Sequence, residues 1–444
     1  MAGLALLVIG VLCAESSVVG VVGPRRPDRV AYLWFVQSLL TSELPCLHLV
    51  WETAVTAGLV ALGALEQTTG WIGLALMIVA ECGLVISQWR QTRAAPVLDA
   101  ALRAATAGSD AALPPEVASI GRRRKRRLVR RRASTPPAGG LPPEVGRVRL
   151  VGLLRPLRPP SGGVEAINDV AYGPHDRQRV DILRPRAVEG RAPVLIHVHG
   201  GSWTGGRRAR QSRTLRSHFA RSGWISISAG YRVSPEATFP DHVIDVKRAI
   251  AWVRAQADDL GADPSCIVLS GVSAGTHLGV LAALTPNAHE WQPGFEHADT
   301  SVSGCIATSG IYDLLDRHDD HPGSKLVPFM TSVVLKSDPV ADRAAWDAAS
   351  PIFRVDPVAP PIFVIHAAKD ALVWREEARR FVDALRTVSQ APVAYAELPG
   401  AQHAFETFYS VRSAHTAMAA VRFGEWLRAN PTTRAQRVAA RARG

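Results

Sequence analysis

The sequence predicts an α/β protein, in which a mostly parallel sheet is covered by helices on both faces, preceded by N-terminal transmembrane helices. From residue 164 onward, short apolar runs typical of buried strands alternate with segments that carry apolar residues at helical spacing. Such alternation favours a parallel sheet between two layers of helices. Before this part, the apolar residues are concentrated in positions 1–90, in runs long enough to cross a membrane.

A chain of 444 residues is too long for one ordinary domain, and changes in composition divide it into four regions. These are a transmembrane region of about three helices (1–90), a linker rich in Pro and Arg (91–163), the α/β domain (164–430) and a basic tail (431–444). The formal charge is +12, but nine Lys and Arg residues lie between Gly121 and Ala133. Because the α/β domain is not broadly basic, we expect no nucleic-acid partner.

Three apolar segments are predicted to span the membrane. Ala2–Val22 lacks the charged start and the cleavage site of a signal peptide, so we interpret it as a membrane helix. The second span lies between Val30 and Leu65, and its most helix-like part is Leu44–Leu65. Trp71–Trp89 holds 19 residues, about 28 Å of helix, and a Trp closes each end as in an interfacial aromatic belt.

The distribution of Lys and Arg predicts the orientation in the membrane. Three Arg residues follow the first span at 25–29, and Arg90, Arg93 and the run Arg122–Arg132 follow the third. The loop between the second and third spans has no positive charge. The positive-inside rule therefore places the N-terminus outside and the α/β domain in the cytoplasm.

Residues 91–163 contain several Pro-Pro pairs and the Arg run, a composition that cannot bury a core, and are therefore predicted to be a linker. We expect the Arg run to contact anionic membrane lipid, at about 1 kcal/mol per basic residue. A nucleic-acid-binding arm is the alternative, but the run lacks interleaved aromatic residues for base stacking.

Four ionisable residues interrupt the apolar spans, namely Glu15, His48, Glu52 and Glu81. A charged group in the hydrocarbon costs several kcal/mol, so such residues either serve a function or satisfy one another. We favour the second interpretation, because nothing in the sequence specifies a transport path. His48 and Glu52 are four residues apart on one helix face, so they are placed to pair.

The elements of the α/β domain follow from periodicity. Strands are expected at Arg179–Leu183, Pro193–Val198, Trp224–Ala229, Ile267–Leu269, Ser303–Thr308, Ile362–His366 and Val393–Leu398. Helices are expected at Arg208–Arg221, Asp241–Ala255, His277–Leu284, Glu376–Leu385 and His415–Leu427. The segment Leu314–Ala349 is expected to supply part of a cap.

One strand-to-helix junction, Gly271-Val272-Ser273-Ala274-Gly275, has the sequence of a nucleophile elbow. Gly271 and Gly275 remove Cβ atoms that would collide where a strand turns sharply into a helix, so Ser273 can stand exposed at the tip. The N-terminus of the following helix points free N–H groups at charge that develops there. An ordinary Gly-rich turn is the alternative, and the rest of the chain has to decide between the two.

A serine nucleophile needs a general base and an acid that orients the base, and in this arrangement both follow the serine. Asp370 lies on the loop after the strand Ile362–His366, and His403 lies on the loop after the strand Val393–Leu398. Because these loops meet at the carboxyl end of the sheet, we predict a catalytic triad of Ser273, Asp370 and His403.

The Gly-rich loop His199–Trp203 follows a buried strand, and its backbone can approach a substrate closely. The N–H groups of Gly201, Ser202 and Ala274 are predicted to form the oxyanion hole. The His-x-His pattern at the start of this loop suggests a metal, but no third ligand is evident, so no metal site is predicted.

Together these motifs resemble the α/β-hydrolase esterases and lipases of the hormone-sensitive-lipase-like group. With its apolar N-terminal spans, the chain also resembles membrane-attached carboxylesterases of mycobacteria and other actinobacteria. The resemblance is carried by His199–Trp203, Tyr231–Glu236, Phe239-Pro240, Gly261–Pro264, Gly271–Gly275, Ser309–Asp313, Asp370 and His403, and covers roughly Ile167–Leu427. It implies an α/β-hydrolase fold and hydrolysis of carboxylic esters without a cofactor.

Three residues depart from the pattern of that group. Ser202 stands where a third Gly is common, closer to the His-Gly-Gly-x-Trp motif of arylformamidase-like enzymes, and Val272 and Thr276 replace an acidic residue and a Gly. We expect a membrane-anchored serine carboxylesterase or lipase that acts on a small-molecule or lipid ester. An amidase or arylformamidase-like hydrolase on the same triad is one alternative, and a non-catalytic membrane scaffold is another.

Overall fold

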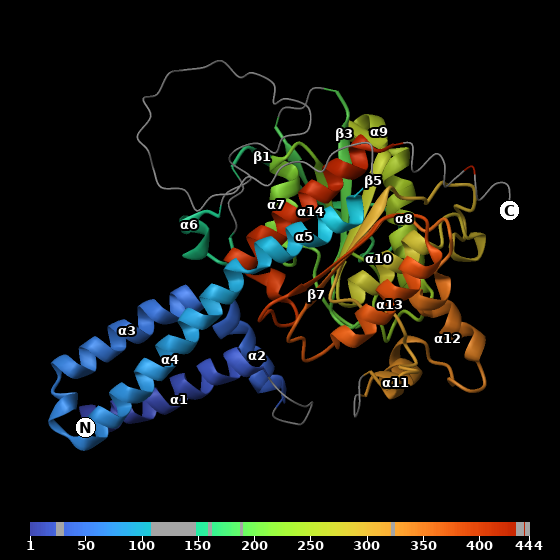
Figure 1. Cartoon of the computed structure of the whole chain (residues 1–444). Coiled ribbons are helices and arrows are strands. Elements are labelled where there is room, and N and C mark those ends of the chain that lie inside the picture. Colours follow the sequence, from blue (N-terminus) through green and yellow to red (C-terminus); the bar gives the residue numbers. More distant parts are fainter. Residues whose placement is uncertain are drawn as a thin grey trace, which may run out of the picture.

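The computed structural model describes residues 1–23, 31–107, 148–158, 162–186, 190–320, 325–431 and 439. A helical region and a sheet region lie next to each other, with the N-terminus at the far end of the helical region (Figure 1). The Arg run within Gly121–Ala133, which we expect to contact lipid, and nearly all of the predicted basic tail lie outside the described residues.

Four helices build the helical region: α1 (Ala2–Val22), α2 (Ala31–Glu43), α3 (Pro45–Ala61) and α4 (Thr68–Thr92). The backbones of α1 and α4 approach closely, since a Cβ on Gly73 would lie 2.6 Å from the carbonyl carbon of Leu6. Two of the described helices are long and apolar enough to cross a membrane, α1 and the nearly continuous helix Thr68–Thr106. Taken together, α2 and α3 pass the same test but are bent by 92°, so two or three spans are available, against three predicted.

The ionisable residues of the apolar helices meet polar neighbours in two places. His48 Nδ1 lies 3.3 Å from Glu52 Oε1 on α3, which confirms the predicted pair. Glu81 on α4 accepts a hydrogen bond of 2.9 Å from Thr53 Oγ1 on α3. Glu15 is exposed and makes no such contact within the described residues. The hydrogen bond between Thr53 and Glu81 joins α3 to α4, as expected for groups that hold helices together.

Eight strands form one sheet in the order β1-β2-β4-β3-β5-β6-β7-β8. β1 pairs with β2, and β2 with β4, in antiparallel fashion, whereas every other pair is parallel, which confirms the predicted mostly parallel sheet. The strands are β1 (Val164–Ala171), β2 (Arg179–Pro185), β3 (Ala192–Val198), β4 (Ile225–Ala229), β5 (Ala262–Val272), β6 (Gly304–Thr308), β7 (Ile362–Ala367) and β8 (Val393–Leu398). The sequence gives no signal for β1, because its side chains are half-buried or exposed and form no apolar run.

Helices cover both faces of the sheet (Figure 1). One face carries α8 (Asp241–Ala255), α10 (Ala274–Leu284) and α13 (Arg375–Val388), and the other carries α5 (Ala94–Thr106), α7 (Arg213–Arg221) and α14 (Val411–Ala429). Along β5, Ile267 and Leu269 join the first core and Val268 joins the second, because successive side chains of a strand point to opposite faces. α14 begins before its predicted start at His415, because the Ser410 side chain caps its N-terminus.

The segment predicted to be a linker begins with a packed helix. In α5, Ala94, Leu98 and Leu102 are buried and belong to the same core as residues of β8 and α14. Their spacing of four residues is that of a helix face that joins a core. The residues that follow are rich in Pro and Arg, and their composition hides this short helical pattern. The prediction of a linker that starts at residue 91 is therefore wrong for Ala94–Thr106.

Polar contacts tie the helical region to the chain around α14. Glu43, the last residue of α2, is buried and pairs with the buried guanidinium of Arg412 on α14. Its second oxygen accepts a hydrogen bond of 2.8 Å from Ser410 Oγ. Arg412 also donates to the carbonyl oxygen of Pro399, which directly follows β8, at 3.0 Å. The junction between the two regions therefore lies beside the carboxyl end of β8.

Candidate active site

Ser273 lies at the turn between β5 and α10, and its backbone is strained, with φ 55° and ψ −126°. Positive φ is uncommon for a residue other than Gly and is characteristic of a nucleophile elbow. The turn requires Gly at position 275, since a Cβ there would lie 2.2 Å from the carbonyl oxygen of Val198 on β3. Thr276 donates a hydrogen bond of 2.7 Å to the carbonyl oxygen of Thr308, which fixes the start of α10 to β6.

Asp370 and His403 meet across two neighbouring loops. Asp370 follows β7 and His403 follows β8, and these strands are parallel neighbours, so both loops lie at the same edge of the sheet. His403 Nδ1 lies 2.8 Å from Asp370 Oδ2. Ser273 lies at this edge too, separated from the pair by β6, and its hydroxyl makes no hydrogen bond to His403 within the described residues. The contact between a nucleophile and its base often tightens only when substrate binds.

Burial and charge set the protonation of the Asp370–His403 pair, whose side chains are 0% and 7% exposed. Burial alone would lower the pKa of His403, but the charge of Asp370 and its hydrogen bond outweigh burial and hold that pKa above its usual value. Burial alone would raise the pKa of Asp370, but the charge and the hydrogen bond of His403 hold it below its usual range. The pair can therefore hold a proton on His403 while Asp370 stays ionised, as a general base requires.

Three residues that the sequence did not single out surround this pair. Gln402 Oε1 accepts hydrogen bonds from the backbone N–H groups of residue 371 (2.8 Å) and of His403 (2.9 Å), which joins the two loops. His366 Nε2 lies 3.7 Å from Asp370 Oδ2. Glu406 is buried near His403, and burial raises the pKa of its carboxyl group to about 7. Proximity to His403 in the sequence is the only signal for Gln402 and Glu406, and no motif marks His366.

The loop after β3 lies against the elbow, since a Cβ on Gly200 would be 3.1 Å from Ser273 Cβ. Gly201 and Ser202 turn the chain with positive φ values of 129° and 51°. Their N–H groups donate no hydrogen bond to any residue that the structure describes. Ala274 is the first residue of α10, so its N–H is one that the helix leaves without an intrahelical partner. All three predicted N–H donors are thus available to an oxyanion.

Trp203 anchors this loop to α10 and to the segment predicted to form a cap. Its indole is buried, and Nε1 donates a hydrogen bond of 3.1 Å to His277 Nδ1. His277 Nε2 in turn lies 2.8 Å from the carbonyl oxygen of Ala349, at the end of α12 (Arg343–Ala349). His277 therefore links the loop after β3 to the segment predicted to form a cap, a role that the sequence did not indicate.

The two histidines at the end of β3 are held by their neighbours. His197 Nδ1 lies 3.0 Å from Ser270 Oγ, and the ring of His199 stacks on Tyr231 with centroids 4.4 Å apart. In the described part of the chain, no group of three or more His, Cys, Asp or Glu side chains is arranged to hold a metal ion.

Comparisons with solved structures establish the fold of this region. A truncated carbohydrate esterase from gut microbiota is 21% identical and superposes with a TM-score of 0.52, covering 60% of this chain and 97% of that one. The fold is that of the α/β-hydrolases. Esterase 2 of Thermogutta terrifontis, in a form phosphonylated by sarin, shares this α/β-hydrolase fold at 25% identity and a TM-score of 0.50, covering 59% of this chain and 94% of that one.

Sequence comparisons connect the α/β-hydrolase fold of this chain to esterases. The family model BD-FAE matches residues 180–385. The probable carboxylic ester hydrolase LipM and esterase LipQ of Mycobacterium tuberculosis are 46% and 45% identical, over 259 and 255 residues, or 57% of this chain. These matches confirm the resemblance to α/β-hydrolase esterases. The chain spans about 60% of the length of both relatives.

Proposed function

We propose that the chain is a membrane-anchored serine carboxylesterase. The hydrogen bond between His403 and Asp370, at the sheet edge that carries Ser273, is the observation that supports this function most. The esterase names of the similar mycobacterial proteins support the reaction class. An acid–base pair at the same edge of the sheet as a strained serine also argues against a scaffold without catalytic activity.

In the proposed mechanism, Ser273 Oγ attacks the ester carbonyl while His403 Nε2 accepts the serine proton. Asp370 keeps the imidazole oriented and stabilises its positive charge. The N–H groups around Gly201 and Ala274 stabilise the oxyanion of the tetrahedral intermediate. His403 then gives its proton to the leaving alcohol, and a water molecule, activated by His403 in the same way, releases the acid from the acyl-enzyme.

The site also has a proposed location, at the surface of the membrane that holds α1 to α4. The buried contact of Glu43 with Arg412 supports it, because this contact joins the end of α2 to the residues that follow β8 and His403. An enzyme held in this position meets lipids and other amphipathic esters at high local concentration. A small-molecule or lipid ester is therefore the proposed substrate.

Replacement of the nucleophile tests the reaction. For Ser273→Ala we expect kcat for p-nitrophenyl ester hydrolysis to fall by about 10⁶-fold, since the attacking group is lost. A fluorophosphonate probe should label the full chain but not this variant. Ser332→Ala, at an exposed position, should behave like the parent. Near-parental turnover by Ser273→Ala would rule out the assignment.

A second pair of variants tests the general base. His403→Ala should lose activity as severely as the serine variant, whereas His415→Ala, on α14, should retain it. The reverse result would mean that the base is wrongly assigned. Comparing acyl esters with N-formyl arylamines as substrates distinguishes an esterase from an arylformamidase-like enzyme on the same residues.

A further inference from the structure

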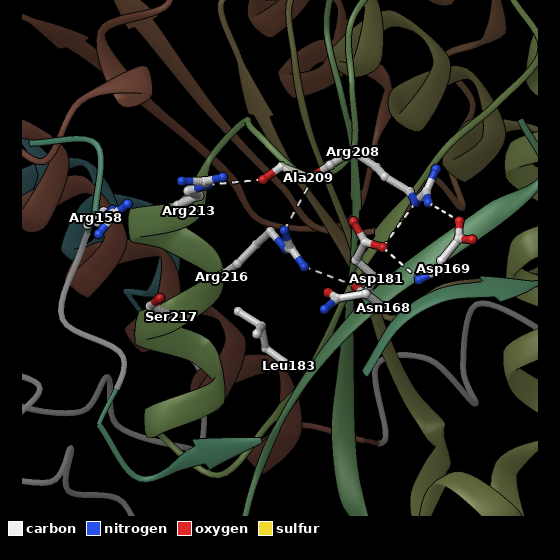
Figure 2. Close-up of a pocket in the computed structure, with 10 residues that line it drawn as sticks. All are labelled: Arg158, Asn168, Asp169, Asp181, Leu183, Arg208, Ala209, Arg213, Arg216 and Ser217. Carbon is white, nitrogen blue, oxygen red and sulfur yellow. Dashed lines mark hydrogen bonds and ion pairs between the residues drawn. The ribbon is translucent and has the colours of Figure 1, made fainter. Parts of the chain in front are cut away.

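A cleft of about 610 Å³ lies on the α7 side of the sheet, between the β1–β2 hairpin and α7, and none of the predicted triad residues lines it. Figure 2 shows that most of the charged groups around it are guanidinium groups. Its charged lining consists of Arg158, Arg208, Arg213, Arg216, Asp169 and Asp181.

Arg216 is the buried centre of this lining, with only 4% of the residue exposed. Its guanidinium donates to two backbone carbonyl oxygens, those of Asp181 at 3.0 Å and Arg208 at 3.4 Å. Its Nε has no hydrogen-bond partner in the part of the chain that the structure describes. Burial lowers the pKa of Arg216 to about 10, so the group is still protonated at neutral pH. The charge of Asp181 offsets this effect of burial only in part, so a buried cation of this kind calls for a further anion.

Both carboxylates that line the cleft, those of Asp169 and Asp181, already form ion pairs. Arg208 pairs with Asp181 at 3.1 Å and also pairs with Asp169, which in addition contacts Arg179 at 3.1 Å. Among the described residues, no carboxylate lies within ion-pair distance of Arg158, Arg213 or Arg216.

Three guanidinium groups therefore face one cleft without paired carboxylates. Arg213 and Arg158 are close neighbours, since Arg213 Nη1 donates to the carbonyl oxygen of Leu157 at 3.0 Å. Planar guanidinium groups match the oxygens of a phosphate group and bind them through paired, charge-assisted hydrogen bonds.

We infer that this cleft binds an anionic phosphate group, held by Arg158, Arg213 and Arg216. Two sources share this chemistry, a soluble phosphate ester and the headgroup of an anionic phospholipid. The inference is independent of the triad, and only the lipid source rests on the proposed membrane location.

The surroundings of the cleft favour the lipid headgroup. The segment 148–158, which supplies Arg158, exposes two leucines, Leu154 at 66% and Leu157 at 58%. Tyr409 binds this segment, because its N–H donates to the carbonyl oxygen of Pro156 at 2.7 Å. The next residue, Ser410, contacts Glu43 of the helical region. Exposed leucines and arginines beside the helices are typical of a surface that lies against lipid.

The test uses the full chain in nanodiscs that contain equal amounts of phosphatidylglycerol and phosphatidylcholine. Native mass spectrometry of the released protein measures which lipid stays bound. We expect preferential retention of phosphatidylglycerol, and a preference about tenfold weaker in the double variant Arg158→Gln/Arg213→Gln, because charge-assisted hydrogen bonds are lost. These two residues are chosen because Arg216→Gln could prevent folding. Arg210→Gln, at an exposed position three residues before Arg213 that does not line the cleft, is the matched control.

Glycerol 3-phosphate distinguishes the two sources. If its binding raises the melting temperature of the parent but not of the double variant, and no phosphatidylglycerol is retained, the cleft takes a soluble phosphate. Retention of phosphatidylglycerol that glycerol 3-phosphate does not displace assigns the lipid headgroup. The inference is wrong if neither probe binds, or if Arg210→Gln loses as much binding as the double variant. Hydrolysis of a soluble ester should be unchanged in both the double variant and Arg210→Gln, which keeps this test separate from that of the triad.

Discussion

Asp370 is enclosed by hydrogen-bond donors. Its Oδ1 accepts from the N–H groups of Leu372 (3.0 Å) and Val373 (2.8 Å), and its Oδ2 accepts from His403. Because these donors stabilise the ionised carboxylate, the pKa of Asp370 lies below its usual range, and the negative charge beside His403 persists at neutral pH. The charge and the hydrogen bond of Asp370 therefore help to raise the pKa of the proposed base against the effect of its burial.

The pH dependence of hydrolysis follows from this geometry. His403 must be neutral to accept a proton, so kcat/KM should fall as the pH decreases through its raised pKa, above the ordinary value of 6.5. Asp370→Asn removes the charge that raises this pKa, so the acid limb should move to lower pH, and the plateau should drop by about 10⁴-fold. A pH–rate profile with a soluble ester checks both effects. Asp383→Asn, at an exposed position on α13, should leave the profile unchanged, and an unmoved acid limb in Asp370→Asn would contradict the account.

Local sequence could predict Ser273, Asp370 and His403 as candidate site residues because each of the three is marked by its immediate neighbours. The elbow is a five-residue string, and Asp370 and His403 directly follow apolar strands. His277 and Gln402 have no such signal. Their contacts join segments that are distant along the chain or depend on a loop conformation that composition does not specify.

At the scale of elements, α5 shows how a short helix can be missed. Its apolar face of Ala94, Leu98 and Leu102 has regular helical spacing, but it covers only three turns and runs into Pro- and Arg-rich sequence. The boundaries of longer elements with strong periodicity were predictable. The helix at Asp241–Ala255 and the strand at Val393–Leu398 begin and end where the sequence places them.

The stability of the sheet region should depend on α5. Leu98 is 1% exposed, so Leu98→Ala leaves a cavity and should lower the free energy of unfolding by about 2–5 kcal/mol. Arg103→Ala, on the exposed side of the same helix, should cost less than about 1 kcal/mol. Thermal unfolding of the purified full chain checks the difference. Equal melting temperatures for the two variants would mean that α5 does not pack as described.

At the scale of the whole molecule, the helical and sheet regions meet through residues that no local pattern connects. Glu43 and Arg412 are 369 positions apart, and both side chains are fully buried. The sequence predicts each region separately. The length of the apolar runs predicts the helical region, and the alternation of strand and helix patterns predicts the sheet region. The contact between them depends on tertiary structure alone, and so does the Arg-lined cleft.

Breaking the buried pair should loosen this junction. Glu43→Gln leaves Arg412 as an unpaired buried cation and should cost about 3–5 kcal/mol of stability. Adding Arg412→Met removes the unpaired buried charge and should recover part of the lost free energy of unfolding. Glu66→Gln, at an exposed position, is the control. Thermal unfolding in detergent or nanodiscs measures the series, and a Glu43→Gln variant as stable as the parent would show that the two regions do not meet in this way.

The helix Thr68–Thr106 has a mechanical consequence. Its 39 residues make a rod of about 58 Å. One end of the rod lies among the apolar helices, and the other end packs in the core beside β8. A helix of this length cannot act as a flexible tether. With α1 to α4 in the membrane, as proposed, it would fix the height and the tilt of the sheet region over the bilayer, and the proposed enzyme would select substrates by their depth in the membrane as well as by their chemistry.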